Sequence, residues 1–182
     1  MADQLLFELS PEAALLEPSQ DVPEKQRVQG VEQSWYALAY DPSTSERALW
    51  NLPLPVQDDF GALGSDVILR LQWTCTPSSG DVVWAVAAAV VEEGDDVDKA
   101  LSAEIETTPV TVTAADKVNL STATLSNLLA SLPAATKSAR LVVRIRRQTT
   151  DIASPVDADV RLLKSQATNA YTSKLEQQLA DV

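Results

Sequence analysis

Hydrophobic and polar residues alternate along most of the chain after residue 34, and this alternation predicts β-strands. It is clearest in residues 66–74, where Val67, Leu69, Leu71 and Trp73 alternate with a mostly polar set. Because successive side chains of a strand point to opposite faces, one face of this segment is predicted to be buried. Similar or wholly apolar segments bounded by turn residues predict seven further strands, at residues 35–40, 47–52, 82–91, 109–113, 117–124, 138–147 and 157–164.

These segments follow one another without alternating helices, which predicts an all-β fold, an antiparallel β-sandwich of about eight strands. We favour a jelly-roll-like version for residues 34–170, with the last strand running on toward Tyr171. The apolar run 82–91 also has the length of a buried helix, but its valines and the turns at both ends favour a strand covered on both faces. Leucines at helical spacing predict short helices within residues 125–132 and in a C-terminal tail at residues 171–182.

Residues 1–33 differ from the rest and are predicted to form an N-terminal arm. Pro11, Pro18 and Pro23 interrupt this segment, and Ser10 can cap a short helix in which Pro11 takes the first position. Its apolar residues would be poorly covered on a free tail, so we expect the arm to dock on its own domain or on a partner. The predicted contact residues of the arm are Leu5, Leu6, Phe7, Leu15 and Leu16.

Composition narrows the classes of function. The 182 residues carry 26 Asp and Glu against 14 Lys and Arg, a net charge of -12, so we expect no nucleic-acid partner. Histidine is absent, which removes the commonest general base and metal ligand, and we predict neither an enzyme nor a bound cofactor or metal. The sequence lacks an apolar run of about 20 residues and a basic start typical of a signal peptide, so we expect cytoplasmic synthesis and no membrane partner.

Acidic residues and the cysteine offer little specific chemistry. The acidic loop 92–98 could supply carboxylates to Ca²⁺, but its spacing does not fit an EF-hand and a solvated loop that protects strand edges is the simpler interpretation. Asp58 and Asp59 could belong to a glycosidase pair, yet nothing in the sequence places two carboxylates across a cleft. Cys75 has no basic neighbour in sequence and is predicted to be a buried, unreactive thiol.

Five cations lie in or beside the predicted strand 138–147, namely Lys137, Arg140, Arg144, Arg146 and Arg147. No aromatic residue is interleaved with them, as a nucleic-acid groove would require. We interpret them as one outward strand face that pairs with an acidic loop of this chain or of a neighbour. Arg144 and Arg146 are the predicted contacts with a neighbouring subunit or partner.

The four tryptophans, Trp35, Trp50, Trp73 and Trp84, all lie on predicted strands. Exposed tryptophan faces can form a platform on which sugars stack, as in carbohydrate modules with sandwich folds. Trp73 and Trp84 share the phase of aliphatic residues, which favours a place in the core for both.

Five stretches, taken in order, resemble a β-sandwich domain found in virion proteins of tailed bacteriophages. They are ALAYD (37–41), ALWNLPLP (48–55), VILRLQW (67–73), SSGDVVW (78–84) and ADVRLL (158–163). The resemblance covers residues 35–165 and includes no catalytic motif.

This resemblance implies a non-enzymatic virion structural protein. A cement, or decoration, protein on the capsid exterior fits the acidity best, because a protein on the inner face would lie against dense phosphate. Its partners would be the major capsid protein and further copies of itself, as a homotrimer. The alternative is a tail or fibre accessory module that binds host-surface carbohydrate.

Overall fold

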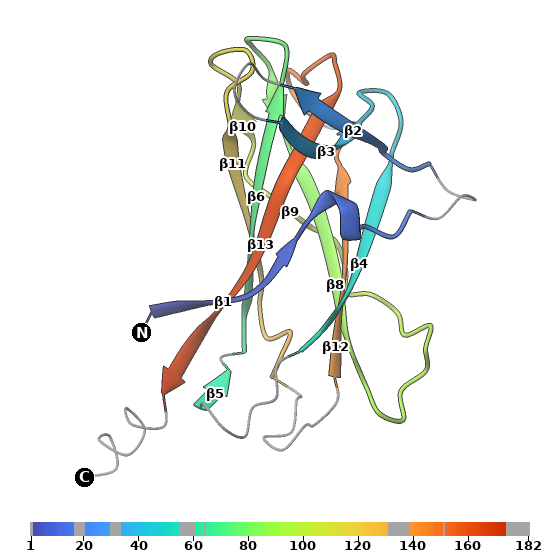
Figure 1. Ribbon diagram of the computed structural model, residues 1–182, viewed down its shortest axis with the longest axis vertical. Coiled ribbons are helices and arrows are strands. Elements are labelled where there is room, and N and C mark those ends of the chain that lie inside the picture. The colour runs from blue at the N-terminus through green and yellow to red at the C-terminus, as the bar shows by residue number, and fades with distance from the viewer. Residues whose placement is uncertain are drawn as a thin grey trace.

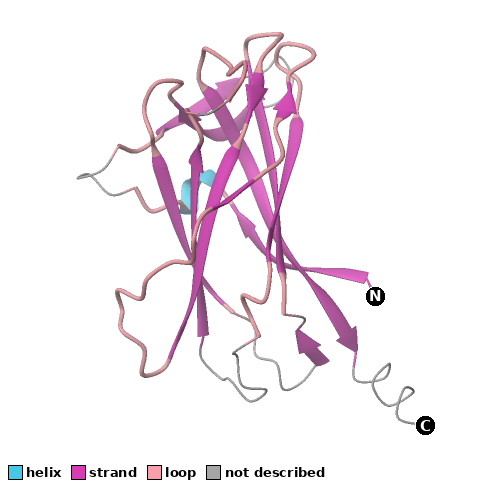
Figure 2. Cartoon of the chain, turned by 180° about the vertical axis from the view of Figure 1, so that it is seen from behind, coloured by secondary structure: helices cyan, strands magenta, loops and turns pink. Residues whose placement is uncertain are grey.

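The computed structural model describes residues 2–16, 21–29, 34–54, 61–63, 65–130, 139–150 and 152–173. These residues form an all-β fold, with one short helix among them (Figure 2). Two large sheets face each other (Figure 1), and the paired strands within each are antiparallel. The predicted fold class, an antiparallel β-sandwich, is confirmed.

One sheet has seven strands, in the order β11-β6-β13-β3-β2, with β1 and β5 also paired with β13. These strands are β1 (Ala2–Leu9), β2 (Glu24–Gln29), β3 (Ser34–Tyr40), β5 (Gly61–Leu63), β6 (Val67–Cys75), β11 (Asn119–Leu125) and β13 (Val160–Ser173). The facing sheet has the order β4-β12-β8-β9. Its strands are β4 (Arg47–Pro53), β8 (Trp84–Glu92), β9 (Ile105–Glu106) and β12 (Ala139–Arg147). A small ribbon pairs β7 (Asp81–Val82) with β10 (Val110–Thr111).

The eight predicted strands are all present, at least in part, and in β6 the alternation places the buried face correctly, whereas near the start of β11 Val118 and Leu120 are exposed and Ser121 is buried. In β12, Leu141, Val143 and Ile145 are fully buried between the sheets. The apolar run 82–91 is a strand and not a helix, and residues 84–90 are buried on both faces, as expected. Four strands were not predicted, namely β1, β2, β5 and β9.

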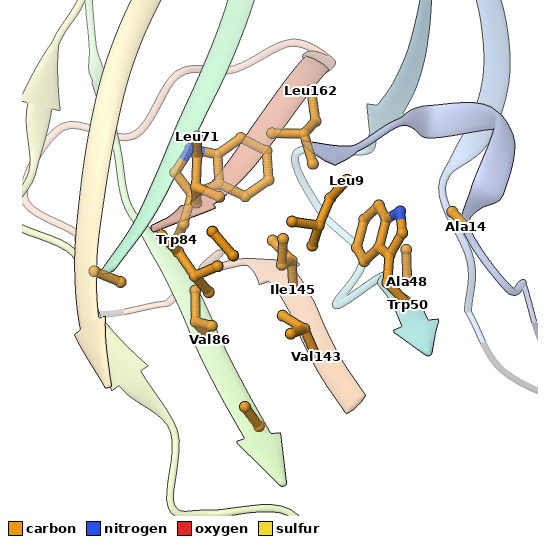
Figure 3. Packing of buried hydrophobic residues seen from close by; sticks show 14 of the residues in the cluster. Leu9, Ala14, Ala48, Trp50, Leu71, Trp84, Val86, Val143, Ile145 and Leu162 are labelled. Carbon is orange, nitrogen blue, oxygen red and sulfur yellow. The ribbon is translucent and has the colours of Figure 1, made fainter. Parts of the chain in front are cut away.

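The core lies between the two sheets and is built around three tryptophans. Trp50, Trp73 and Trp84 are fully buried. The Tyr40 ring meets the Trp84 ring edge to face, with centroids 5.1 Å apart. In the view of Figure 3, Leu9 lies between Trp84 and Trp50, and it belongs to the same hydrophobic cluster. The N-terminal segment therefore contributes a side chain to this core.

The segment predicted as an arm begins with a strand of the sandwich. β1 pairs with the second half of β13, and β3 pairs with its first residues. A 3-10 helix, Pro11–Ala13, follows, and the Ser10 hydroxyl caps it by accepting from the Ala13 N–H, as predicted. Leu15 then forms a β-bridge with Leu49 of the other sheet. Residues 2–16 thus run across the open side of the sandwich from one sheet to the other.

Neither leucine-rich helix is observed among the described residues. β13 continues through Ser173, so the start of the predicted C-terminal helix is strand, and residues 174–182 lie outside the described residues. Residues 126–130 form turns in which Asn127 has a φ of 57° and ends the regular backbone after β11. Of the part of the chain that the structure describes, no helix has the length and apolar character to cross a membrane.

Candidate functional site

The outer face of the seven-stranded sheet is hollowed beside β2 and β3. The hollow is a groove of about 530 Å³, which we call the Trp35 groove. Side chains of β2, β3, β6, β13 and the loop before β11 form its walls and floor. Its lining residues are Gln26, Arg27, Val28, Trp35, Thr74, Asp116, Val118, Arg161 and Leu163.

Strand alternation and register bring these residues together. Tyr40 of β3 points into the core, so Trp35, an odd number of residues away, belongs to the outer face. Val28 of β2 lies directly opposite Trp35. On the neighbouring strands, Arg161 of β13 lies directly opposite Thr74 of β6. Four strands from distant parts of the sequence therefore meet on one surface.

Trp35 is the tryptophan that the fold leaves accessible. Its side chain is 46% exposed, whereas the other three tryptophans are fully buried. Val118, at the same groove, is 63% exposed. Tyr36 is also exposed, but it points to the other side of β3 and lines a second hollow of about 260 Å³ that borders Trp35 as well. The groove therefore offers one broad indole face beside apolar and polar side chains.

Polar groups without partners lie in the Trp35 groove. Thr74 is only 6% exposed, and its Oγ1 atom has no hydrogen-bond partner among the described residues. The Nε atom of Arg161 is also buried without a partner. Asp116 adopts a left-handed conformation, with a φ of 54°, and its N–H donates to the Cys75 carbonyl at 2.8 Å. That bond fixes the turn carrying Asp116 at the groove.

This arrangement can bind a ligand that combines an apolar face with hydroxyl groups. The indole of Trp35 can stack on the C–H face of a sugar ring, and Thr74, Asp116 and Gln26 can exchange hydrogen bonds with hydroxyls. Among the described lining residues Asp116 is the single carboxylate, so the acid–base pair of glycoside hydrolysis does not assemble in this groove.

The sequence pattern points to Trp35 as one of four possible stacking residues, but not to Thr74, Asp116 or Arg161. The outward phase of β6 and β13 is visible in the sequence. The register that sets Arg161 opposite Thr74 joins two strands far apart along the chain. The sequence pattern does not reveal this pairing.

The predicted basic face lies on the other sheet and is paired within the chain. Arg146 contacts Glu104 at 2.6 Å, and Arg144 contacts the same carboxylate at 3.1 Å. Hydrogen bonds from Arg146 are the main cause that holds the pKa of Glu104 below its usual value. Of the two partners expected for this face, the structure supplies an acidic side chain of the same chain.

Arg147 does not belong to the outward basic face, which corrects the interpretation from sequence. It shares the phase of the buried residues of β12 and is only 2% exposed. Its guanidinium donates to the carbonyls of Tyr40, Val156 and Ala158. Burial lowers the pKa of Arg147. Three backbone acceptors therefore bind the guanidinium directly.

Two of the predicted contact residues of the arm lie against their own sandwich. Phe7 and Leu16 are partly buried on the hydrophobic core. Leu15 is 55% exposed, although its backbone bridges to β4. Leu5 and Leu6 belong to β1, and their side chains lie outside the described residues.

The acidic loop and the cysteine have local structural roles. Asp95 pairs with Lys99 at 2.7 Å, and Asp96 accepts from the Asp98 N–H, so both carboxylates bond within the loop. Among the described residues, no cluster of three or more metal-ligating side chains could hold a metal ion. Cys75 is buried, and burial raises the pKa of its thiol. The candidate residues Asp58, Asp59 and Lys137 lie outside the described residues.

Comparisons with known proteins support the fold. No family model and no curated protein matches the sequence. Two similar solved structures are the CBM22-1 and CBM22-2 xylan-binding domains of Xyn10C from Paenibacillus barcinonensis. The first has a TM-score of 0.50 at 10% identity and covers 94% of this chain and 97% of its own. The second has a TM-score of 0.51 at 11% identity and covers 90% of this chain and 99% of its own.

These similarities show that the chain has a β-sandwich fold shared with carbohydrate-binding modules. They extend over almost the whole length of both domains, so the fold is matched as a unit. The sandwich implied by the resemblance to virion proteins is thus supported. Both of these neighbours are xylan-binding domains, and neither links the chain to a virion.

Proposed function

We propose that this chain is a non-catalytic carbohydrate-binding module that holds a glycan in the Trp35 groove. The observation that carries the proposal is the combination of one exposed tryptophan with a buried, unpartnered threonine hydroxyl in the same groove. A sugar ring offers an apolar face to the indole and hydroxyls to Thr74. Two sandwich domains of the same fold that bind xylan support the class of ligand.

The proposal takes up the carbohydrate-binding alternative of the sequence analysis. The capsid-decoration hypothesis stays a prediction. The arm and the basic face, which it would use as contact surfaces, both make contacts within this chain. The exposed indole of Trp35, in contrast, can stack on a sugar ring.

The test is binding of the full chain to a panel of soluble polysaccharides, measured by affinity gel electrophoresis and then by titration calorimetry. Trp35→Ala is the decisive variant. The exposed part of an indole is on the order of 100 Å², and its burial contributes about 2 kcal/mol, which corresponds to more than a tenfold loss of affinity. Tyr36→Ala is the matched control, because Tyr36 is similarly exposed on the same strand but points to its other side.

We expect Trp35→Ala to weaken binding at least about tenfold and Tyr36→Ala to change it less than about twofold. Equal losses in the two variants would mean that the binding surface lies elsewhere. If no polysaccharide in the panel binds the wild-type chain, the proposal is wrong.

A further inference from the structure

The side chains that line the Trp35 groove carry a net positive charge, whereas the whole chain is negatively charged. The groove is lined by two guanidinium groups, Arg27 and Arg161, and one carboxylate, Asp116, in a protein whose net charge is -12. From this contrast we infer that the groove selects a sugar that carries a carboxylate, a uronic acid unit, and that Arg161 binds that carboxylate. The inference rests on the proposed function, because it names the ligand class of the same groove.

Arg161 lacks an anionic partner among the described residues. It lies opposite Thr74 on one side and Ala39 on the other, in the middle of the sheet. It makes no hydrogen bond or ion pair with any described residue, and its Nε atom is buried without a partner. An unpaired buried donor on a charged group is costly, and a ligand that accepts from it removes this cost.

Other arginines of the two sheets show how this chain satisfies guanidinium groups, although the Nε atoms of Arg144 and Arg147 also lack a hydrogen-bond partner. Arg144 and Arg146 share the Glu104 carboxylate, and Arg147 donates to three backbone carbonyls. Arg161 has neither kind of partner, although Asp116 lines the same groove. The position for an anion next to Arg161 is therefore left to a ligand.

A carboxylate fits this position better than a neutral hydroxyl does. Its two oxygens can accept two parallel hydrogen bonds from a guanidinium, whereas a hydroxyl accepts fewer and carries no charge. The Thr74 hydroxyl, which also lacks a partner, can donate to the same carboxylate. Arg27, which donates a long hydrogen bond of 3.3 Å to the Ser34 hydroxyl, adds a second positive charge at the groove.

Asp116 and Trp35 define the rest of the expected binding mode. The Asp116 carboxylate can accept from sugar hydroxyls, and the indole of Trp35 covers a ring face. The repulsion between the acidic protein and an acidic glycan is long-range, and it is screened beyond a Debye length of about 8 Å at physiological ionic strength. A carboxylate bound to Arg161 lies well within this length, so salt screens their attraction little. We therefore expect the selectivity for the carboxylate to persist at about 0.15 M salt.

The test compares ligands that differ only in the carboxylate. Oligomers of galacturonic, glucuronic and mannuronic acid are titrated into the full chain, each as the free acid and as the methyl ester. We expect the wild-type chain to bind at least one free acid at least about tenfold more tightly than its ester. Neutral xylan oligomers complete the panel.

The variants separate the charge from the stacking surface. Arg161→Gln should abolish the preference for the acid while leaving affinity for the ester within about twofold, and Arg161→Lys should keep part of the preference. Trp35→Ala should weaken both ligand forms. Arg140→Gln, on the other sheet, is the control and should change nothing. Because Arg161 has no hydrogen-bond partner among the described residues, Arg161→Gln should also leave the melting temperature at or above that of the wild type.

The outcomes distinguish this inference from the proposed function. If acids and esters bind equally, or if neutral oligomers bind more tightly and do so through Trp35, the uronic acid inference is wrong while the carbohydrate-binding function stands. If Arg161→Gln unfolds the chain, Arg161 has a structural partner and the inference is also wrong. If no carbohydrate binds, both are wrong.

Discussion

Truncating Leu9 to alanine tests whether the N-terminal segment belongs to the sandwich or is a separable arm. Leu9 is 1% exposed and lies in the central hydrophobic cluster, as Figure 3 shows. Leu→Ala at such positions destabilises proteins by about 2 to 5 kcal/mol, through lost burial and the cavity that remains. A middle value of about 3 kcal/mol, at roughly 3 °C per kcal/mol for a domain of this size, lowers the melting temperature by about 9 °C.

Leu15→Ala is the matched control. Leu15 lies in the same segment but is 55% exposed, so its truncation should change the free energy of unfolding by less than about 0.5 kcal/mol. The assay is differential scanning calorimetry, supported by urea denaturation to check that the m-value is unchanged.

A separable arm predicts no effect of either variant on the melting temperature. A wild-type melting temperature for Leu9→Ala, within roughly 2 °C, would therefore refute the packing argument, because a cavity of this kind has a cost that the assay resolves. Equal destabilisation by Leu15→Ala would refute it as well, since burial would no longer explain the loss.

Two further predictions concern arginine contacts. Arg147→Ala leaves three backbone carbonyls without their donor. It should therefore reduce the free energy of unfolding, measured by urea melts, by about 3 kcal/mol or more. Arg140→Ala, at an exposed site, is the control and should reduce it by less than about 0.5 kcal/mol. Glu104→Gln should cost up to about 1 kcal/mol at pH 7. The pKa of Glu104 is lowered in the folded state, so its stabilisation is present above its unfolded pKa and is lost as the pH falls through the folded value. Urea melts at decreasing pH should show the difference between Glu104→Gln and wild type shrinking, and a constant difference would contradict this.

The strands that the sequence predicts well are those with one face in the core. In β6 and β12 the burial of every second side chain leaves a period of two that local inspection detects. β2 was missed because it lies at the edge of its sheet, where Val28 stands alone among polar residues. β1 was missed because three consecutive apolar residues hide its alternation, and because its partner β13 lies at the opposite end of the chain.

Arg147 shows a second limit of the sequence pattern. Its phase in β12 is that of Val143 and Ile145, which predicts an inward position, but its charge suggested an outward one. The phase was the better guide. Carbonyls from the ends of distant segments satisfy the guanidinium, and no local pattern reveals them. The sequence does not reveal the neighbours of Trp35 for the same reason, because pairing between distant strands forms the groove.

The two outer faces of the sandwich differ in a way that favours the Trp35 groove as the binding surface. On the four-stranded sheet, the outward residues Ala87 and Ala89 are buried, and the Ser102 N–H, in the segment that follows the acidic loop, donates to the Ala88 carbonyl at 2.9 Å. A hollow of about 460 Å³ remains beside this loop, but Trp50, the aromatic residue among its described lining, is fully buried and donates to the backbone. It cannot stack on a ligand. On the seven-stranded sheet, no segment among the described residues covers Trp35 to the same degree, and the unpartnered groups lie directly beside it. Unpartnered buried atoms occur on both sheets, since the Nε atom of Arg144 beside the second hollow also lacks a partner, but only the Trp35 groove combines them with an exposed indole among the described residues, as binding a sugar requires.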